Sequence, residues 1–104
     1  MVTKTYIKSR NVWKVKFELP KAEWPVGVNV RSVHVTGDFN RWDKSEYTLK
    51  LRKGVYSLIM ELQAGEYQYR YVINGTDWYN DWHADGYVPN NGGSDNCVLQ
   101  LQES

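Results

Sequence analysis

The stretch "VYSLIMELQAGEYQYRYVING", residues 55–75, decides the fold, because it holds two runs of alternating side chains separated by a glycine. Alternation with a period of two is typical of a β-strand with one buried face. The second run places four large side chains on one face: Tyr67, Tyr69, Tyr71 and Ile73. Gly65 lies three residues after Leu62, so the short connection predicts a hairpin loop between the two strands.

Three further runs alternate in the same way, namely "VWKVKFEL" (12–19), "SVHVTG" (32–37) and "NCVLQLQ" (96–102). The inward faces of the first and last runs are predicted to hold Trp13, Val15, Phe17, Leu19, Cys97, Leu99 and Leu101. Nowhere does a window of three turns keep the helical period. The pattern predicts an all-β fold, an immunoglobulin-like antiparallel β-sandwich, and the length predicts a single domain over residues 1–104.

Composition and charge exclude several classes of protein. Residues 1–54 carry 12 Lys/Arg and 5 Asp/Glu, whereas residues 55–104 carry 1 Arg and 7 Asp/Glu. A single cysteine, Cys97, excludes an internal disulfide framework. There is no run of 18 apolar residues, so no membrane span and no membrane partner are expected. The N-terminus lacks the apolar core of a signal peptide, which predicts a cytoplasmic protein.

Aromatic residues gather in loops outside the alternation. Trp42 stands in "VTGDFNRWD" (35–43), and Trp78, Tyr79 and Trp82 stand in region 75–95, the longest stretch without alternation. These loops also contain amides and carboxylates, namely Asn40, Asp43, Asn80, Asp81 and Asn96. A single tryptophan could equally well cap the end of the sandwich. The whole set favours a sugar site, because aromatic faces stack on a sugar ring while polar groups bond its hydroxyls.

Arg70 is the only cation of the second half of the chain and faces outward by parity. Arg70 is either a solvated arginine of a strand, or its guanidinium donates several hydrogen bonds to sugar hydroxyls. The loop aromatics lie in the half of the chain with a negative balance of charge. Nucleic acid is therefore an unfavourable partner, since it needs a basic groove.

Neither a catalytic nor a metal site is expected. Asp77, Asp81 and Asp85 follow each other at spacings of four, but without the closing Glu of a calcium loop, and we interpret them as solvated loop residues. Two histidines and one cysteine are too few for a transition-metal site. A glycosidase needs two carboxylates that flank a cleft. A chain this short offers no walls for one, so the sequence predicts no enzyme and no cofactor.

Several ordered motifs together resemble a known family. They are "VTGDFNRWD", then "KGVYSL", "AGEYQYRYVINGTDW" and "GGSDNCVLQL", and the match covers about residues 28–101. The chain resembles the isoamylase N-terminal early-set domain, or family-48 carbohydrate-binding module, a group that includes the glycogen-binding domain of the AMP-activated protein kinase beta subunit. The opening segment with "VWKVKFELP" is similar to short stand-alone bacterial members.

The resemblance implies an early-set sandwich that binds α-1,4-glucan, such as glycogen, starch or maltooligosaccharide, without catalysis. By analogy Phe39 packs in the core, and the glucan contacts fall on Trp42, Arg70, Trp78 and Asn96. Secondary contacts are expected at Asn40, Tyr79 and Trp82. Gly92 stands where the kinase domain has a bulky apolar contact. Some early-set domains serve as structural or docking modules of glycogen-metabolising enzymes, and this is the alternative function that the resemblance implies.

Overall fold

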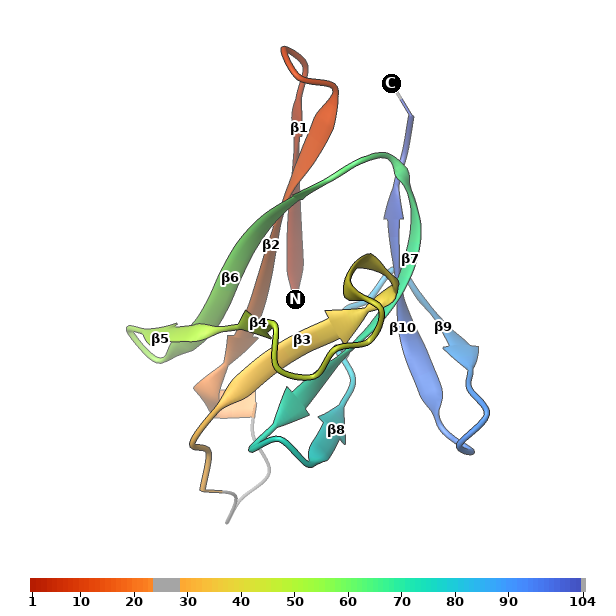
Figure 1. The fold of residues 1–104 in the computed structure, drawn as a ribbon. Coiled ribbons are helices and arrows are strands. Elements are labelled where there is room, and N and C mark those ends of the chain that lie inside the picture. Colours follow the sequence, from red (N-terminus) through yellow and green to blue (C-terminus); the bar gives the residue numbers. More distant parts are fainter. Residues whose placement is uncertain (24–28, 104) are drawn as a thin grey trace.

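The computed structural model describes residues 1–23 and 29–103, and these residues form two antiparallel β-sheets (Figure 1). The four-stranded sheet has the order β1 (Val2–Ile7), β2 (Val12–Pro20), β6 (Val55–Leu62), β5 (Lys50–Arg52). The six-stranded sheet has the order β4 (Tyr47–Thr48), β3 (Val33–Gly37), β7 (Gly65–Ile73), β10 (Asp95–Leu101), β9 (Gly86–Pro89), and β8 (Asp77–Tyr79) pairs with β7. The described residues also form two short 3-10 turns, η1 (Lys21–Glu23) and η2 (Asp38–Asn40), and no α-helix. The prediction of an all-β antiparallel sandwich is confirmed.

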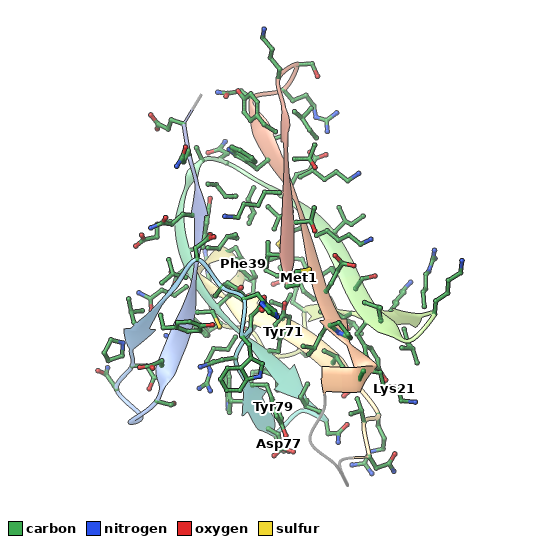
Figure 2. All side chains as sticks on the ribbon, turned by 180° about the vertical axis from the view of Figure 1, so that it is seen from behind. Met1, Lys21, Phe39, Tyr71, Asp77 and Tyr79 are labelled. Atoms are coloured by element: carbon green, nitrogen blue, oxygen red, sulfur yellow. The ribbon has the colours of Figure 1, made fainter. Side chains whose placement is uncertain are left out.

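The core lies between the two sheets and follows the predicted alternation. Phe17 on β2 and Tyr69 on β7 are both fully buried, and their rings meet edge to face with centroids 5.4 Å apart. Tyr71 lies between the sheets next to Tyr69, with 6.0 Å between the ring centroids (Figure 2). Phe39 of η2 contacts Phe17 at 5.8 Å, so the turn before Trp42 is packed onto the core. Edge-to-face pairs of this kind add stability beyond the area that they bury.

The hairpin predicted around Gly65 is wrong. β6 belongs to the four-stranded sheet and β7 to the six-stranded sheet, so the chain arcs from one sheet to the other (Figure 1). Gly65 is the first residue of β7 and pairs with Leu101 of β10. Both runs present an apolar face to the same core. A short connection between two such runs suits an arch between sheets as well as a hairpin, and the alternation does not distinguish the two.

Region 75–95 is more ordered than the predicted loop, because it contains β8 and β9. β8 pairs with Val72 and its neighbours, and β9 pairs with β10. Strands of three and four residues are too short to show a period. No helix of the described residues is long and apolar enough to cross a membrane.

Gly37 ends β3 at a point where the backbone of β7 comes very close. A Cβ atom at position 37 would lie 2.2 Å from the carbonyl oxygen of Gln68 and 2.9 Å from Cα of Tyr69. Overpacking of this kind forces backbone shifts. We therefore expect Gly37→Ala to lower the free energy of unfolding by about 2 kcal/mol in urea denaturation. Gly86→Ala is the matched control, because its Cβ would meet only Val98 at 3.8 Å; equal stability losses in the two variants would contradict this account.

Cys97 is a buried thiol of β10, as its parity predicts. Burial is the main cause that raises the pKa of the Cys97 thiol to about 11. Because the thiolate is the reactive form, we expect a disulfide reagent at pH 8 to label the native protein at least about a hundredfold more slowly than the urea-unfolded chain. Labelling at similar rates in the two states would show that this thiol is accessible.

Candidate functional site

The outer face of the six-stranded sheet collects the polar and aromatic side chains of the site. Register places Arg70 opposite Thr36 of β3, and Val72 opposite Trp78 of β8. Cross-strand partners point to the same side of a sheet. Arg70 and Trp78 therefore share the face that points away from the core. Thr36, Val72 and Val98 also belong to this face by parity, yet they are buried, so the centre of the face is covered rather than open to water.

The turn after β3 displays Trp42 while it keeps Phe39 inside. Asn40 is buried, and its Oδ1 accepts hydrogen bonds from the Gly37 backbone N–H at 3.0 Å and from the Thr36 hydroxyl at 3.3 Å. Its Nδ2 donates to the Asp43 carbonyl at 3.0 Å. The side chain of Asn40 thus replaces the backbone partners that a tight turn lacks.

Trp42 and Trp78 border an open hollow of about 360 Å³. Their ring centroids are 6.5 Å apart, and the ring planes meet at 47°. Trp78 is 40% exposed, and Trp42 is half-buried. Arg70, Asn90 and Asn96 complete the lining, so four of the predicted contact residues, from three strands and one turn, meet at one place.

Arg70 is held in place by three interactions. Its Nε donates to Oδ1 of Asn80 at 2.7 Å, and one Nη donates to the hydroxyl of Ser94 at 3.3 Å. The guanidinium carbon lies 5.5 Å from the centroid of the Trp78 ring, in a cation–π contact. Asn80 is fixed in turn by its donation to the Asp95 carbonyl at 3.0 Å. The guanidinium of Arg70 is therefore held in one orientation by its neighbours.

Asn96 lies within a chain of amide side chains. Its Nδ2 donates to Oε1 of Gln68 at 3.0 Å, and its Oδ1 accepts from Nδ2 of Asn90 at 3.1 Å. Asn90 also accepts hydrogen bonds from the backbone N–H groups of Gly92 and Ser94, which closes the turn before β10. An amide nitrogen has two hydrogens and an amide oxygen two lone pairs. Asn96 thus keeps one donor and one acceptor position for a ligand.

Three predicted secondary contacts lie outside the lining of this hollow. Asn40 is inside the turn, and Tyr79 packs against the core at the end of β8 (Figure 2). Trp82 is 76% exposed, three residues beyond β8.

Asp81 corrects the interpretation of the loop aspartates as solvated. It is only 2% exposed. Its carboxylate accepts from the Tyr69 hydroxyl at 3.2 Å and from the His83 backbone N–H at 2.9 Å, and it lies 2.7 Å from the amino group of Met1. Burial and the neighbouring charge of Asp81 both raise the pKa of Tyr69. Asp81 anchors the loop that follows β8. The spacing of the three aspartates in the sequence did not predict this role.

Asn90, which lines the hollow, and Gln68, which accepts from Asn96, were not predicted as site residues. Gln68 alternates with Arg70 on β7, so the same parity argument would have found it. Asn90 was part of an "NNGG" stretch, whose composition indicates only a turn. Nothing in that stretch indicates that Asn90 lines the hollow.

The sequence model of the family described as "Glycogen recognition site of AMP-activated protein kinase" matches residues 21–104. The chain belongs to this family. The resemblance drawn from the motifs is therefore confirmed, and the match includes every residue that lines the hollow.

A plant protein is similar over much of the same region. "Protein PTST homolog 2, chloroplastic" of Arabidopsis thaliana is 30% identical over 78 residues, which are 73% of this chain. The chain spans only 13% of the length of that relative. The family is a group of carbohydrate-binding modules described as a glycogen recognition site, which supports binding of glycogen or starch in general. The described residues contain no cluster of three or more potential metal ligands.

Proposed function

We propose that the hollow between Trp42 and Trp78 binds an α-1,4-linked glucan without catalysis. The observation that carries this proposal is the pair of partly exposed indole rings, with centroids 6.5 Å apart and planes inclined by 47°, which line one hollow together with two amides and a guanidinium. Family membership supports the same class of ligand.

The angle between the rings favours a curved chain. Successive glucose units of an α-1,4-glucan turn relative to each other, so two inclined faces can each stack on one sugar ring. A flat β-1,4-glucan would rest on only one of the two rings. Stacking withdraws apolar C–H groups of the sugar and the faces of the rings from water.

Arg70 and Asn96 are proposed to bond the hydroxyl groups between the two platforms. Each already has partners that fix its orientation, and each keeps unused hydrogen-bonding capacity. Fixed polar groups lose little entropy when the ligand arrives, which favours affinity. Among the residues that the structure describes, no carboxylate lines the hollow. This supports binding without hydrolysis, since a glycosidase places two carboxylates about the scissile bond.

Titration with maltoheptaose and β-cyclodextrin, followed by intrinsic tryptophan fluorescence, tests the proposal. We expect a saturable change with both α-glucans and none with cellohexaose. An assay for reducing sugar on the same samples should stay at its background. Saturation only with cellohexaose, or no response to any α-glucan, would contradict the proposal, and the second result would favour a module that docks to glycogen-metabolising enzymes.

A further inference from the structure

Asp38 connects the ring of Trp42 to the sheet. One carboxylate oxygen accepts from the indole N–H of Trp42 at 3.1 Å, and the other accepts from the backbone N–H of Gln68 at 2.8 Å. We propose that Asp38 is a positioning residue that holds the Trp42 ring in its glucan-binding orientation. This inference rests on the proposed function of the hollow, and it adds a residue that does not line the hollow itself.

The backbone at Trp42 explains why such a restraint is needed. Arg41 and Trp42 have φ angles of 57° and 60°, two successive left-handed residues with large side chains. This conformation is uncommon for bulky residues and is kept only where the surroundings enforce it. The Trp42 backbone N–H donates to the Gly37 carbonyl at 2.9 Å, which fixes the main chain. That bond does not fix the side chain, whose ring stands at the surface.

The second oxygen of Asp38 fills a gap in the β-ladder. The last pair between β3 and β7 joins Gly37 to Tyr69. Gln68, the preceding residue of β7, lies beyond the end of β3, and its N–H binds the Asp38 carboxylate instead. The side chain of Gln68 accepts from Asn96 at 3.0 Å. Asp38 therefore links the aromatic platform to the strand that carries the polar side of the hollow.

Fixing the ring favours binding through entropy. A surface tryptophan that moves freely between rotamers must be immobilised when a sugar stacks on it, and that immobilisation weakens affinity. With the carboxylate present, the ring is ordered in the free protein. Loss of the carboxylate should therefore weaken binding mainly through the indole that it holds.

A double-mutant cycle separates this role from a purely structural one. We expect Asp38→Ala to weaken binding of maltoheptaose about fivefold in calorimetry, as for the loss of one net hydrogen bond. Trp42→Phe keeps an aromatic ring but has no N–H to donate. In the Trp42→Phe background we expect Asp38→Ala to change affinity by less than about 1.5-fold, because the coupling between the two residues is gone.

Equal losses in both backgrounds, or no loss in either, would overturn the positioning role while leaving the proposed function intact. Failure of the wild-type protein to bind any α-glucan would overturn both. Exchange of the indole N–H with solvent, measured by NMR on the wild-type protein, gives a readout that does not depend on a folded variant. Trp42 is expected to exchange more slowly than Trp82, which is 76% exposed; equal rates would contradict the Asp38 bond.

Discussion

Replacing Trp42 or Trp78 with alanine is expected to weaken maltoheptaose binding by about thirtyfold in each case. Truncating an aromatic anchor of an interface typically removes about 2 kcal/mol of binding free energy, and this corresponds to about thirtyfold in the dissociation constant. Both rings border the hollow, and neither belongs to the buried core. Calorimetry gives the affinity, and urea denaturation of each variant should show a stability within about 1 kcal/mol of the wild type.

Trp82→Ala is the matched control for these two variants. Trp82 is also an exposed tryptophan, but it does not line the hollow. As a secondary contact at most, it should change affinity less than about threefold, well below a hot-spot effect. A Trp42→Ala variant that binds glucan normally but unfolds easily would make the ring of Trp42 a structural residue, and the proposed site would be wrong.

Phe17→Ala is expected to produce the largest loss of stability, about 4 kcal/mol in urea denaturation. The Phe17 ring is fully buried and meets Tyr69 at 5.4 Å and Phe39 at 5.8 Å. Its removal leaves a cavity at the centre of the sandwich, and the neighbouring rings can fill that cavity only in part. This loss is a large part of the free energy of unfolding of a typical small protein, which is about 5–15 kcal/mol.

Ile59→Ala is the control for the core variant. Ile59 lies on the neighbouring strand β6 but is 51% exposed. Surface substitutions of this kind usually stay within about 0.5 kcal/mol. If Phe17→Ala and Ile59→Ala lowered stability equally, the interior assigned from the alternation would be wrong.

The sequence predicted the long strands because each spans enough residues to show a period. β1 was missed since Lys4, on the face that would otherwise be apolar, breaks the alternation. In the structure Lys4 pairs with Val15 in register, and its ammonium reaches the Asp85 carboxylate at the open edge of the sandwich. β4, β5 and β8 have only two or three residues, too few for any pattern. The arch between β6 and β7 depends on tertiary packing, which local pattern does not contain.

The aromatic platforms could be proposed from the sequence because both tryptophans stand in polar stretches outside the long alternating runs and match family positions. That the two tryptophans lie next to each other could not be predicted from the sequence. It depends on the strand registers by which the end of β3 and the short strand β8 are placed beside β7. For the same reason, only the structure shows the hydrogen bond between Trp42 and Asp38. The same holds for the hydrogen bonds that join the side-chain amides of Gln68, Asn96 and Asn90. The interpretation of Asp81 as solvated was wrong, because the spacing of aspartates in a sequence does not distinguish a buried carboxylate from a solvated one.

The most direct test of the glucan site is an NMR titration with β-cyclodextrin that follows the indole N–H signals of the five tryptophans. We expect the signals of Trp42 and Trp78 to shift together and to saturate at one dissociation constant. The signal of Trp13, whose N–H donates to the Gln102 carbonyl at 2.9 Å away from the hollow, should stay in place. Saturable binding that leaves the Trp42 and Trp78 signals unmoved would contradict it.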